Sequence, residues 1–403
     1  LDQINRLFLE SLEGVRVIRA FNKQKAESDR FDSANADFAG TAMAAGRITS
    51  LLIPAINVIF GVTTAAVLGL GAHYAETGIM EVGSLVANSQ YISMVLTSVI
   101  MLSMVIMMFP TSYACAARIA EVLETETSIQ DGAYPFEQRP LRSTLEFRHV
   151  TFAYPGAQEP ILKDISFVSR PGEVTAIIGG TGRGKSSILK LIPRLYDPLF
   201  GEILVDGVNI REYRLEDLRS IIGYVPQKNV LFSGDIASNL NFGKEDGTQE
   251  DWIEAARIAC AEEFIEKKPE GYHDRIAQGG SNLSGGQRQR AWIAMALAQD
   301  TQVILLDEPT TYLDMAHQLE VLKLLEKLNK TRGKTIALVI HDLNLAARFS
   351  DRMIAMRAGK VLHEGTPEEI MTPTVLEEVF SLKACISKDP WTGRPTCVTY
   401  EIS

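Results

Sequence analysis

The chain has few cysteines and no block of positive charge, and each absence excludes a class of protein. Its four cysteines, Cys115, Cys260, Cys385 and Cys397, form no Cys-x-x-Cys pair and show no spacing typical of a metal site. We therefore expect ordinary thiols in a reducing compartment, not a disulfide framework. Of 403 residues, 40 are basic and 50 acidic, which makes the net charge −10. Such a chain is not expected to bind nucleic acid through bulk charge, and its 46% hydrophobic content excludes a disordered tail protein.

Formal charge is also nearly missing from residues 48–117, where only Glu76 and Glu81 carry it. The uncharged runs 48–75 and 82–117 both exceed the roughly 20 apolar residues that a membrane helix needs. We expect two membrane helices joined by a short polar turn near these acids. Arg47 and Arg118 flank the hairpin, and cationic ends favour the cytoplasm, so the turn is expected to face outward. The alternative is a pair of long core helices in a soluble protein, which rarely need uncharged runs of this length.

The first 47 residues mix charged residues with apolar ones at helical spacing, which predicts a soluble helix, a turn and a second helix running back. The chain begins with leucine and no signal peptide is recognisable, so we expect a fragment whose start is missing.

A polar linker over residues 124–143 precedes a segment of different character. Short apolar runs at 174–178, 203–205, 221–225, 303–306 and 335–340 alternate with helical patterns. This alternation predicts an α/β domain with a mainly parallel sheet.

The run 174–178 leads into the pattern GxxxxGK[ST], which is typical of a phosphate-binding loop. The loop comprises Gly179, Gly180, Thr181, Gly182, Arg183, Gly184, Lys185 and Ser186, and Ser187 follows it. Glycines let backbone N–H groups surround phosphates, and the N-terminus of the next helix favours anions. We expect Lys185 to reach the outer phosphates and Ser186 to hold Mg²⁺.

A second apolar run, 303–306, ends in Asp307 and Glu308. An acid at a strand end beside the phosphate loop can hold Mg²⁺ through water. The following acid can deprotonate the attacking water.

Residues 283–287, Leu-Ser-Gly-Gly-Gln, lie between these two motifs, and the combination resembles the ATP-binding cassette (ABC) transporter family. The resemblance extends to Gln227, His341, Tyr154 and Asp314. It implies ATP and Mg²⁺ as cofactors, with Glu308, His341 and Gln227 as catalytic residues and Ser186, Gln227 and Asp307 at the metal. The implied ATP contacts further include Tyr154 on the adenine, the phosphate loop with Ser187, and Asp314. From a second cassette they include Ser284, Gly285, Gly286 and Gln287.

The front of the chain is similar to ABC exporters, in which membrane and cassette domains are fused. Residues 14–21 resemble the region of a coupling helix, and residues 118–123 resemble the exit into the linker. The resemblance implies a partial α-helical membrane domain over 1–123, with helices at about 48–75 and 82–117, and an α/β P-loop NTPase cassette over 144–382. It also implies a multi-pass protein of the cytoplasmic membrane with its cassette in the cytoplasm. The expected partners are lipid, a transported substrate and a second half-transporter, identical or different.

After about residue 290 the chain is more similar to the ATPases of iron-siderophore importers, including a tail over 383–403 with no evident packing partner. Two functions are therefore expected: ATP-driven export, and as the alternative an ATPase subunit of siderophore import. The covalently linked hairpin favours export. It also disfavours the soluble ABC proteins of DNA repair or translation.

Overall fold

The computed structural model describes residues 2–133, 143–180, 182, 184–244, 247–311 and 313–402. The side chains of Asp2 and Leu52 are excluded from this description. The predictions for Thr181, Arg183 and much of the linker therefore lie outside the described residues. The chain divides into two compact units, residues 1–126 and 127–403.

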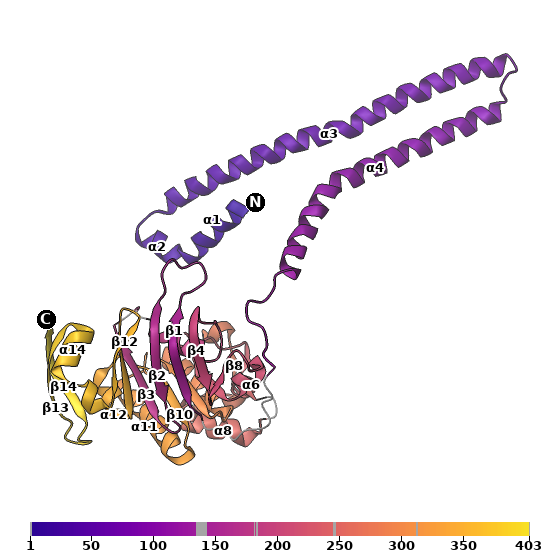
Figure 1. The fold of residues 1–403 in the computed structure, drawn as a ribbon. Coiled ribbons are helices and arrows are strands. Elements are labelled where there is room, and N and C mark those ends of the chain that lie inside the picture. Colours follow the sequence, from indigo (N-terminus) through magenta and orange to yellow (C-terminus); the bar gives the residue numbers. More distant parts are fainter. Residues whose placement is uncertain are drawn as a thin grey trace. The chain divides into compact units, whose positions relative to one another are not determined.

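The first unit is helical (Figure 1). Its helices are α1 (Asp2–Glu13), α2 (Val15–Ala20), α3 (Gln24–Glu76) and α4 (Val82–Leu123). The helix–turn–helix expected before residue 47 is confirmed, with α2 lying in the turn. Glu10 of α1 pairs with Arg30 of α3 at 3.4 Å.

Helix α3 runs without interruption from its charged first half into the uncharged stretch after Ile48. Its 53 residues extend about 80 Å at 1.5 Å per residue, far beyond the roughly 30 Å hydrocarbon core of a bilayer. The most apolar windows of α3 and α4 are long enough to cross a membrane, and no residue of either window is buried. They are therefore not core helices within this chain. The absence of a Cβ at Gly71 makes room for the side chain of Leu85 across the turn.

The second unit is built on two sheets (Figure 1). The larger one has the order β12-β11-β3-β10-β9-β6 among the described residues. Its strands are β12 (Lys360–Gly365), β11 (Arg352–Arg357), β3 (Val174–Gly179), β10 (Thr335–Val339), β9 (Val303–Asp307) and β6 (Ile222–Val225). The strands β11, β3, β10, β9 and β6 pair in parallel, so the predicted parallel sheet is confirmed.

The expected strand at 203–205 belongs instead to a separate antiparallel sheet of order β2-β1-β4-β5. That sheet comprises β1 (Leu145–Phe152), β2 (Leu162–Ser169), β4 (Phe200–Val205) and β5 (Val208–Asn209). In β2, buried and exposed residues alternate, as in a sheet with one covered face. Strand β3 is buried along its whole length, since both of its faces are covered.

Two cores lie on opposite faces of the parallel sheet. Ala176 and Ile178 enter one core, whereas Ile177 between them enters the other. The second core also contains buried residues of the antiparallel sheet and of α5 (Lys185–Leu191). Successive side chains of such a strand point into opposite cores. Each position along the strand must therefore be apolar, which gives a continuous apolar run in the sequence.

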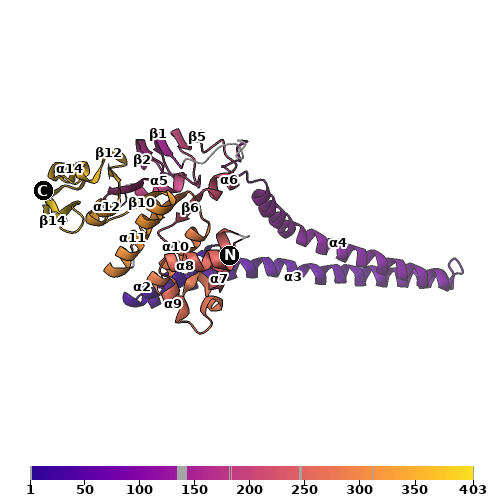
Figure 2. The same cartoon turned by 90° about the horizontal axis from the view of Figure 1, so that it is seen from below.

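The remaining elements complete the second unit. These are α6 (Leu215–Ser220), α7 (Ile236–Leu240), α8 (Gln249–Ile258), α9 (Glu262–Glu266), α10 (Gly285–Ala298), α11 (Met315–Arg332), α12 (Leu343–Phe349), α13 (Pro367–Ile370), α14 (Pro373–Phe380), short 3₁₀ turns at Asn241–Gly243, Gly271–His273 and Gln278–Gly280, and the strands β7 (Gly234–Asp235), β8 (Arg275–Ile276), β13 (Leu382–Lys388) and β14 (Pro395–Ile402). Helices α7 to α10 gather on one side of the unit, away from β1 and β2 (Figure 2).

The described part of the predicted tail, residues 383–402, folds as an antiparallel hairpin of β13 and β14 and packs on the rest of its unit. Ala384, Ile386 and Cys397 contact the core that also contains Ala346 and Leu376. The expectation that this tail lacks a packing partner is therefore wrong. Composition did not reveal the contact, because several apolar residues of the tail, among them Trp391 and Ile402, remain exposed.

Candidate active site

The phosphate-binding loop follows directly from β3 and leads into α5, the context that the motif requires. Gly179 has φ +150°, and a Cβ there would lie 2.4 Å from the carbonyl oxygen of Met356. Gly184 has φ +89° and caps α5, where a Cβ would lie 2.6 Å from Leu162. Both positions therefore demand glycine for backbone conformation and for space.

Lys185 is buried at the start of α5 and turns its amine back into the loop. Its Nζ donates to the carbonyl oxygens of Gly179 and Gly180, both at 2.8 Å. Burial lowers the pKa of Lys185, and the nearby carboxylates of Glu308 and Asp307 partly offset that effect. The amine thus lies among the backbone groups that would surround a phosphate.

Ser186 and Asp307 come together at the carboxyl end of the parallel sheet. The Ser186 hydroxyl donates to Oδ1 of Asp307 at 2.8 Å. Burial raises the pKa of Asp307, because desolvation disfavours its charged form. A hydroxyl and a carboxylate are hard oxygen donors of the kind that Mg²⁺ binds in proteins, so this pair fits the ion.

Glu308 is held by three side chains from different segments. Oε1 lies 2.6 Å from Nε2 of His341, and Oε2 accepts from Nε2 of Gln227 at 2.8 Å. The third contact comes from the hydroxyl of Thr311, 3.2 Å from Oε2. The structure thus brings together the three residues that were predicted to be catalytic.

Thr311 was missed by the sequence analysis as a functional residue. The signal available was its position three residues after Glu308. Its backbone N–H also donates to the Glu308 carbonyl, which forms a tight turn here. Glu308 itself has φ +53°, a left-handed conformation that is costly for a non-glycine residue and often marks a functional site.

Tyr154 lies beside the phosphate-binding helix. Its hydroxyl is 2.9 Å from Oγ of Ser187, and its ring packs edge-on against Phe152 and Tyr196. These contacts place the predicted adenine-binding ring next to the phosphate-binding helix, within the same unit.

The Leu-Ser-Gly-Gly-Gln motif forms the start of another helix, α10. Ser284 caps it: its hydroxyl accepts from the Gln287 N–H at 3.2 Å, and the Gln287 side chain accepts from the Ser284 N–H at 3.0 Å. Helix α10 packs on α7, α8 and β6, whereas α5 packs on β3, β9 and β10. The two motifs are thus carried by helices with different neighbours.

Asp314 acts in this structure as the N-cap of α11. Its carboxylate accepts from the backbone N–H of His317 at 2.9 Å and contacts the His317 ring. These contacts hold the pKa of Asp314 below its usual value. Its predicted contact with ATP stays a prediction, as does the predicted role of Gln227 at the metal.

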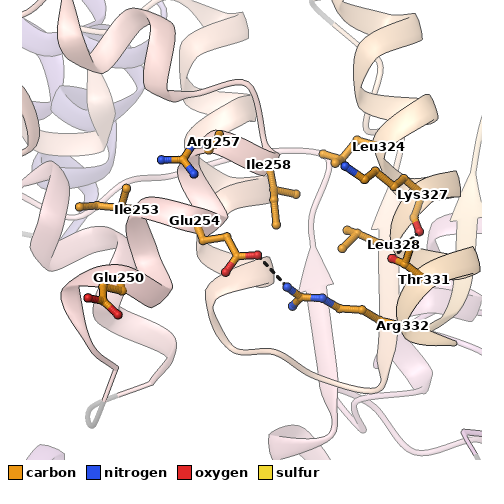
Figure 3. A pocket seen from close by; sticks show the side chains of 10 residues that line it. All are labelled: Glu250, Ile253, Glu254, Arg257, Ile258, Leu324, Lys327, Leu328, Thr331 and Arg332. Carbon is orange, nitrogen blue, oxygen red and sulfur yellow. Dashed lines mark hydrogen bonds and ion pairs between the residues drawn. The ribbon is translucent and has the colours of Figure 1, made fainter.

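A cavity of about 490 Å³ lies away from these motifs, between α8 and α11 (Figure 3). The ion pair of Arg332 with Glu254, 2.8 Å long, spans part of it. None of the predicted site residues lines this cavity, so it is not the candidate nucleotide site.

Comparison with known proteins places this geometry in a family. The family described as "ABC transporter" matches residues 162–311, and "ABC transporter transmembrane region" matches residues 1–99. The chain is 38% identical to an uncharacterised ABC transporter ATP-binding protein of Mycobacterium tuberculosis, over 94% of this chain and 65% of that protein. It is 33% identical to the ATP-dependent lipid A-core flippase of Syntrophus aciditrophicus, over 92% of this chain and 61% of the flippase.

A solved structure, that of a bacterial Atm1-family ABC exporter with ATP bound, has 28% identity and a TM-score of 0.81. It covers 92% of this chain and 65% of the exporter. The chain thus spans somewhat less than two thirds of the length of these proteins. One chain thus contains both a transporter cassette and a transporter membrane region. The chain belongs to the ABC transporter family, in its exporter type with fused membrane and cassette domains.

Proposed function

We propose that this chain is a subunit of an ATP-driven exporter that couples ATP hydrolysis in its cassette to movement of a substrate across the cytoplasmic membrane. The observation that carries the proposal is the convergence of Gln227, His341 and Thr311 on the carboxylate of Glu308. The neighbouring Asp307 meets Ser186 of the phosphate-binding helix. Bound Mg²⁺ would supply charge neutralisation for the phosphates, with Ser186 and Asp307 holding it.

Glu308 is the proposed general base, whose carboxylate takes a proton from the attacking water. His341 and Gln227 hold that carboxylate from two sides and fix its direction. The short contact requires a proton on Nε2 of His341, because a carboxylate can only accept. Lys185 supplies positive charge at the outer phosphates, and Tyr154 offers its ring to the adenine.

We propose a composite site made by two cassettes. Ser284, Gly285 and Gly286 begin α10, a helix of 14 residues whose N-terminus favours anions. A partner's α10 would close over ATP bound at Lys185 and exclude water from the phosphate. A second half-transporter, identical or different, is therefore a required partner. ATP would favour the closed pair and hydrolysis would reopen it.

The coupling surface is proposed to be apolar on both sides. Helix α2 and the residue after it expose Val17 and Phe21, by 60% and 73%. On the cassette, Phe232 and Phe242 stack at 4.4 Å and are exposed by 48% and 61%. A stacked aromatic pair exposed to this degree is typical of a binding surface. We propose that the coupling region around α2 docks on this pair in the cassette of a second copy.

The alternative, an ATPase subunit of siderophore import, gains no support from the relatives. The flippase and the exporter are named for the opposite kind of transport. The resemblance of the tail to importer ATPases stays a prediction about sequence alone.

Phosphate release by the chain in lipid vesicles with Mg²⁺ and ATP tests the proposal. Lys185→Ala should bind ATP at least about tenfold more weakly and release no phosphate above background, because the loop loses the amine proposed to reach the outer phosphates. Full activity in that variant would contradict the assignment of the site. Release of phosphate without any ATP-driven accumulation of substrate would leave the ATPase intact and contradict export.

A further inference from the structure

The C-terminal hairpin is hydrogen-bonded to helix α12 near both ends of that helix. At the start, the side-chain oxygen of Asn344 accepts from the backbone N–H of Cys397 at 2.7 Å. The Asn344 amide nitrogen donates to the Cys397 carbonyl at 3.1 Å. At the end, the Arg394 guanidinium donates to the carbonyl of Ser350, the C-cap of α12, at 3.2 Å.

Further contacts strengthen this attachment. Arg348 of α12 pairs with Asp389 of the hairpin loop at 3.8 Å. The loop is itself ordered, since the backbone N–H of Trp391 donates to the Asp389 carboxylate at 2.8 Å. The side chain of Cys397 also packs against the core that holds Ala346 and Ala347 of α12. Helix α12 is therefore held between the core and the hairpin.

The position of α12 matters because of the residue that precedes it. Strand β10 ends at Val339, and His341 lies between this strand and α12. Asp342 separates His341 from the helix and caps it, accepting from the Leu345 N–H at 2.8 Å. A shift or rotation of α12 would therefore move the loop that presents His341 to Glu308.

We propose that the β13–β14 hairpin acts as a clamp on α12 and thereby positions His341. Asn344 is the positioning residue of this clamp. The proposal rests on the function proposed above, because it assigns a control element to the same site. Asn344 does not touch Glu308 and acts only through the helix. A displacement of about 1 Å at a reacting group can lower a rate about a hundredfold, so a short clamp on this loop can govern turnover.

The chemistry of the clamp specifies the side chain. Asn344 must accept one hydrogen bond and donate another, and a carboxamide does both. Aspartate keeps the acceptor and loses the donor, whereas alanine loses both. The groups that Asn344 contacts on Cys397 belong to the backbone, so the thiol is not required for these two bonds.

Hydrogen exchange measured on the whole chain in lipid tests the clamp without any ATPase assay. Asn344→Ala and Arg394→Ala should both exchange faster over residues 341–350, while residues 174–180 and 184–191 keep the wild-type rate. Trp391→Ala is the matched control in the same hairpin, because that side chain is 89% exposed. It should leave all of these segments unchanged. Unchanged exchange over 341–350 in both clamp variants would overturn the proposal.

Steady-state hydrolysis of Mg-ATP tests the positioning role. Asn344→Ala should lower kcat about tenfold with KM for ATP unchanged, and Asn344→Asp should lower it less. Wild-type kcat in Asn344→Ala, or an equal loss through KM, would overturn the positioning role. If the wild-type chain hydrolyses no ATP, the proposed function fails, whereas the exchange experiment still decides on the clamp.

Discussion

Nε2 of His341 lies 2.6 Å from Oε1 of Glu308, although 33 residues separate the two in sequence. Their strands, β10 and β9, are parallel neighbours in register, with Val339 paired to Asp307. The carboxyl ends of adjacent parallel strands open at the same edge of a sheet. The contact is thus a direct result of strand order, and it gives Glu308 a fixed direction.

Glu308→Gln should abolish turnover while ATP still binds. The amide is nearly isosteric but cannot take a proton, and general-base catalysis contributes about 10²–10⁴-fold. Phosphate release should fall by at least about a hundredfold, and binding of a fluorescent ATP analogue should stay within about twofold of the wild type. Glu401→Gln, an exposed change on β14, is the control and should retain full activity. If Glu308→Gln still hydrolysed ATP at the wild-type rate, a residue other than Glu308 would be the general base.

Two inactive variants should restore activity when mixed, if the site is shared between cassettes. Lys185→Ala disables the phosphate loop, and Gly286→Asp places an anion at the start of the partner's α10. In a dimer that contains one copy of each variant, one of the two composite sites keeps both an intact phosphate loop and an intact start of α10. Random pairing of equal amounts then predicts about a quarter of the wild-type phosphate release. Release that stays at background after co-expression would instead favour a site complete within one cassette.

Phe242→Ala should weaken the proposed docking of the coupling region on the cassette of a second copy. Removing one ring of the stacked pair removes apolar contact area, while the cassette loses little stability because the ring is 61% exposed. Trypsin should cleave at Arg16 and Arg19 of α2 several-fold faster in this variant than in the wild type. The melting temperature should change by less than about 2 °C. Trp391→Ala, also an exposed aromatic, serves as the matched control; equal cleavage rates in all three proteins would contradict docking at this pair.

Asp235 should contribute to stability in a pH-dependent way. It caps α7, and the Ser238 hydroxyl is the main cause that holds the pKa of Asp235 below its usual value. A lowered folded-state pKa means that the contribution is fully present above the unfolded-state pKa, near 4, and is lost as pH falls through the folded-state pKa. Thermal melts from pH 7 to pH 3 should therefore show a larger loss for the wild type than for Asp235→Asn. Parallel curves for the two proteins would contradict this role of the cap.

The motif residues of the site could be predicted from sequence because each belongs to a short local pattern. Gly184, Lys185 and Ser186 follow one strand and begin one helix, so the sequence around them determines their backbone. The same holds for Ser284 and Gln287, which cap α10 reciprocally. Residues such as Thr311 were missed because a threonine carries no signal of what its hydroxyl contacts.

The assignment of individual strands was less complete. Residues 203–205 look like any other short apolar run, yet they pair with β1 in an antiparallel sheet. A run of three residues carries too little alternation to distinguish one sheet from the other. The tail posed a similar problem. Its two hydrogen bonds with Asn344 are made by the backbone of Cys397, and the carbonyl of any residue and the N–H of any residue except proline could provide them.

Composition and local pattern were thus sufficient for the two long apolar helices, the phosphate loop and the alternation of parallel strands with helices, since uncharged length, glycine spacing and periodicity act within a few turns of chain. Only the tertiary structure decided that Gln227, His341 and Thr311 meet on one carboxylate and that Asn344 is hydrogen-bonded to the hairpin. Those contacts join segments tens of residues apart. Their geometry depends on strand order and on how helices pack over the sheet, and no local pattern records either.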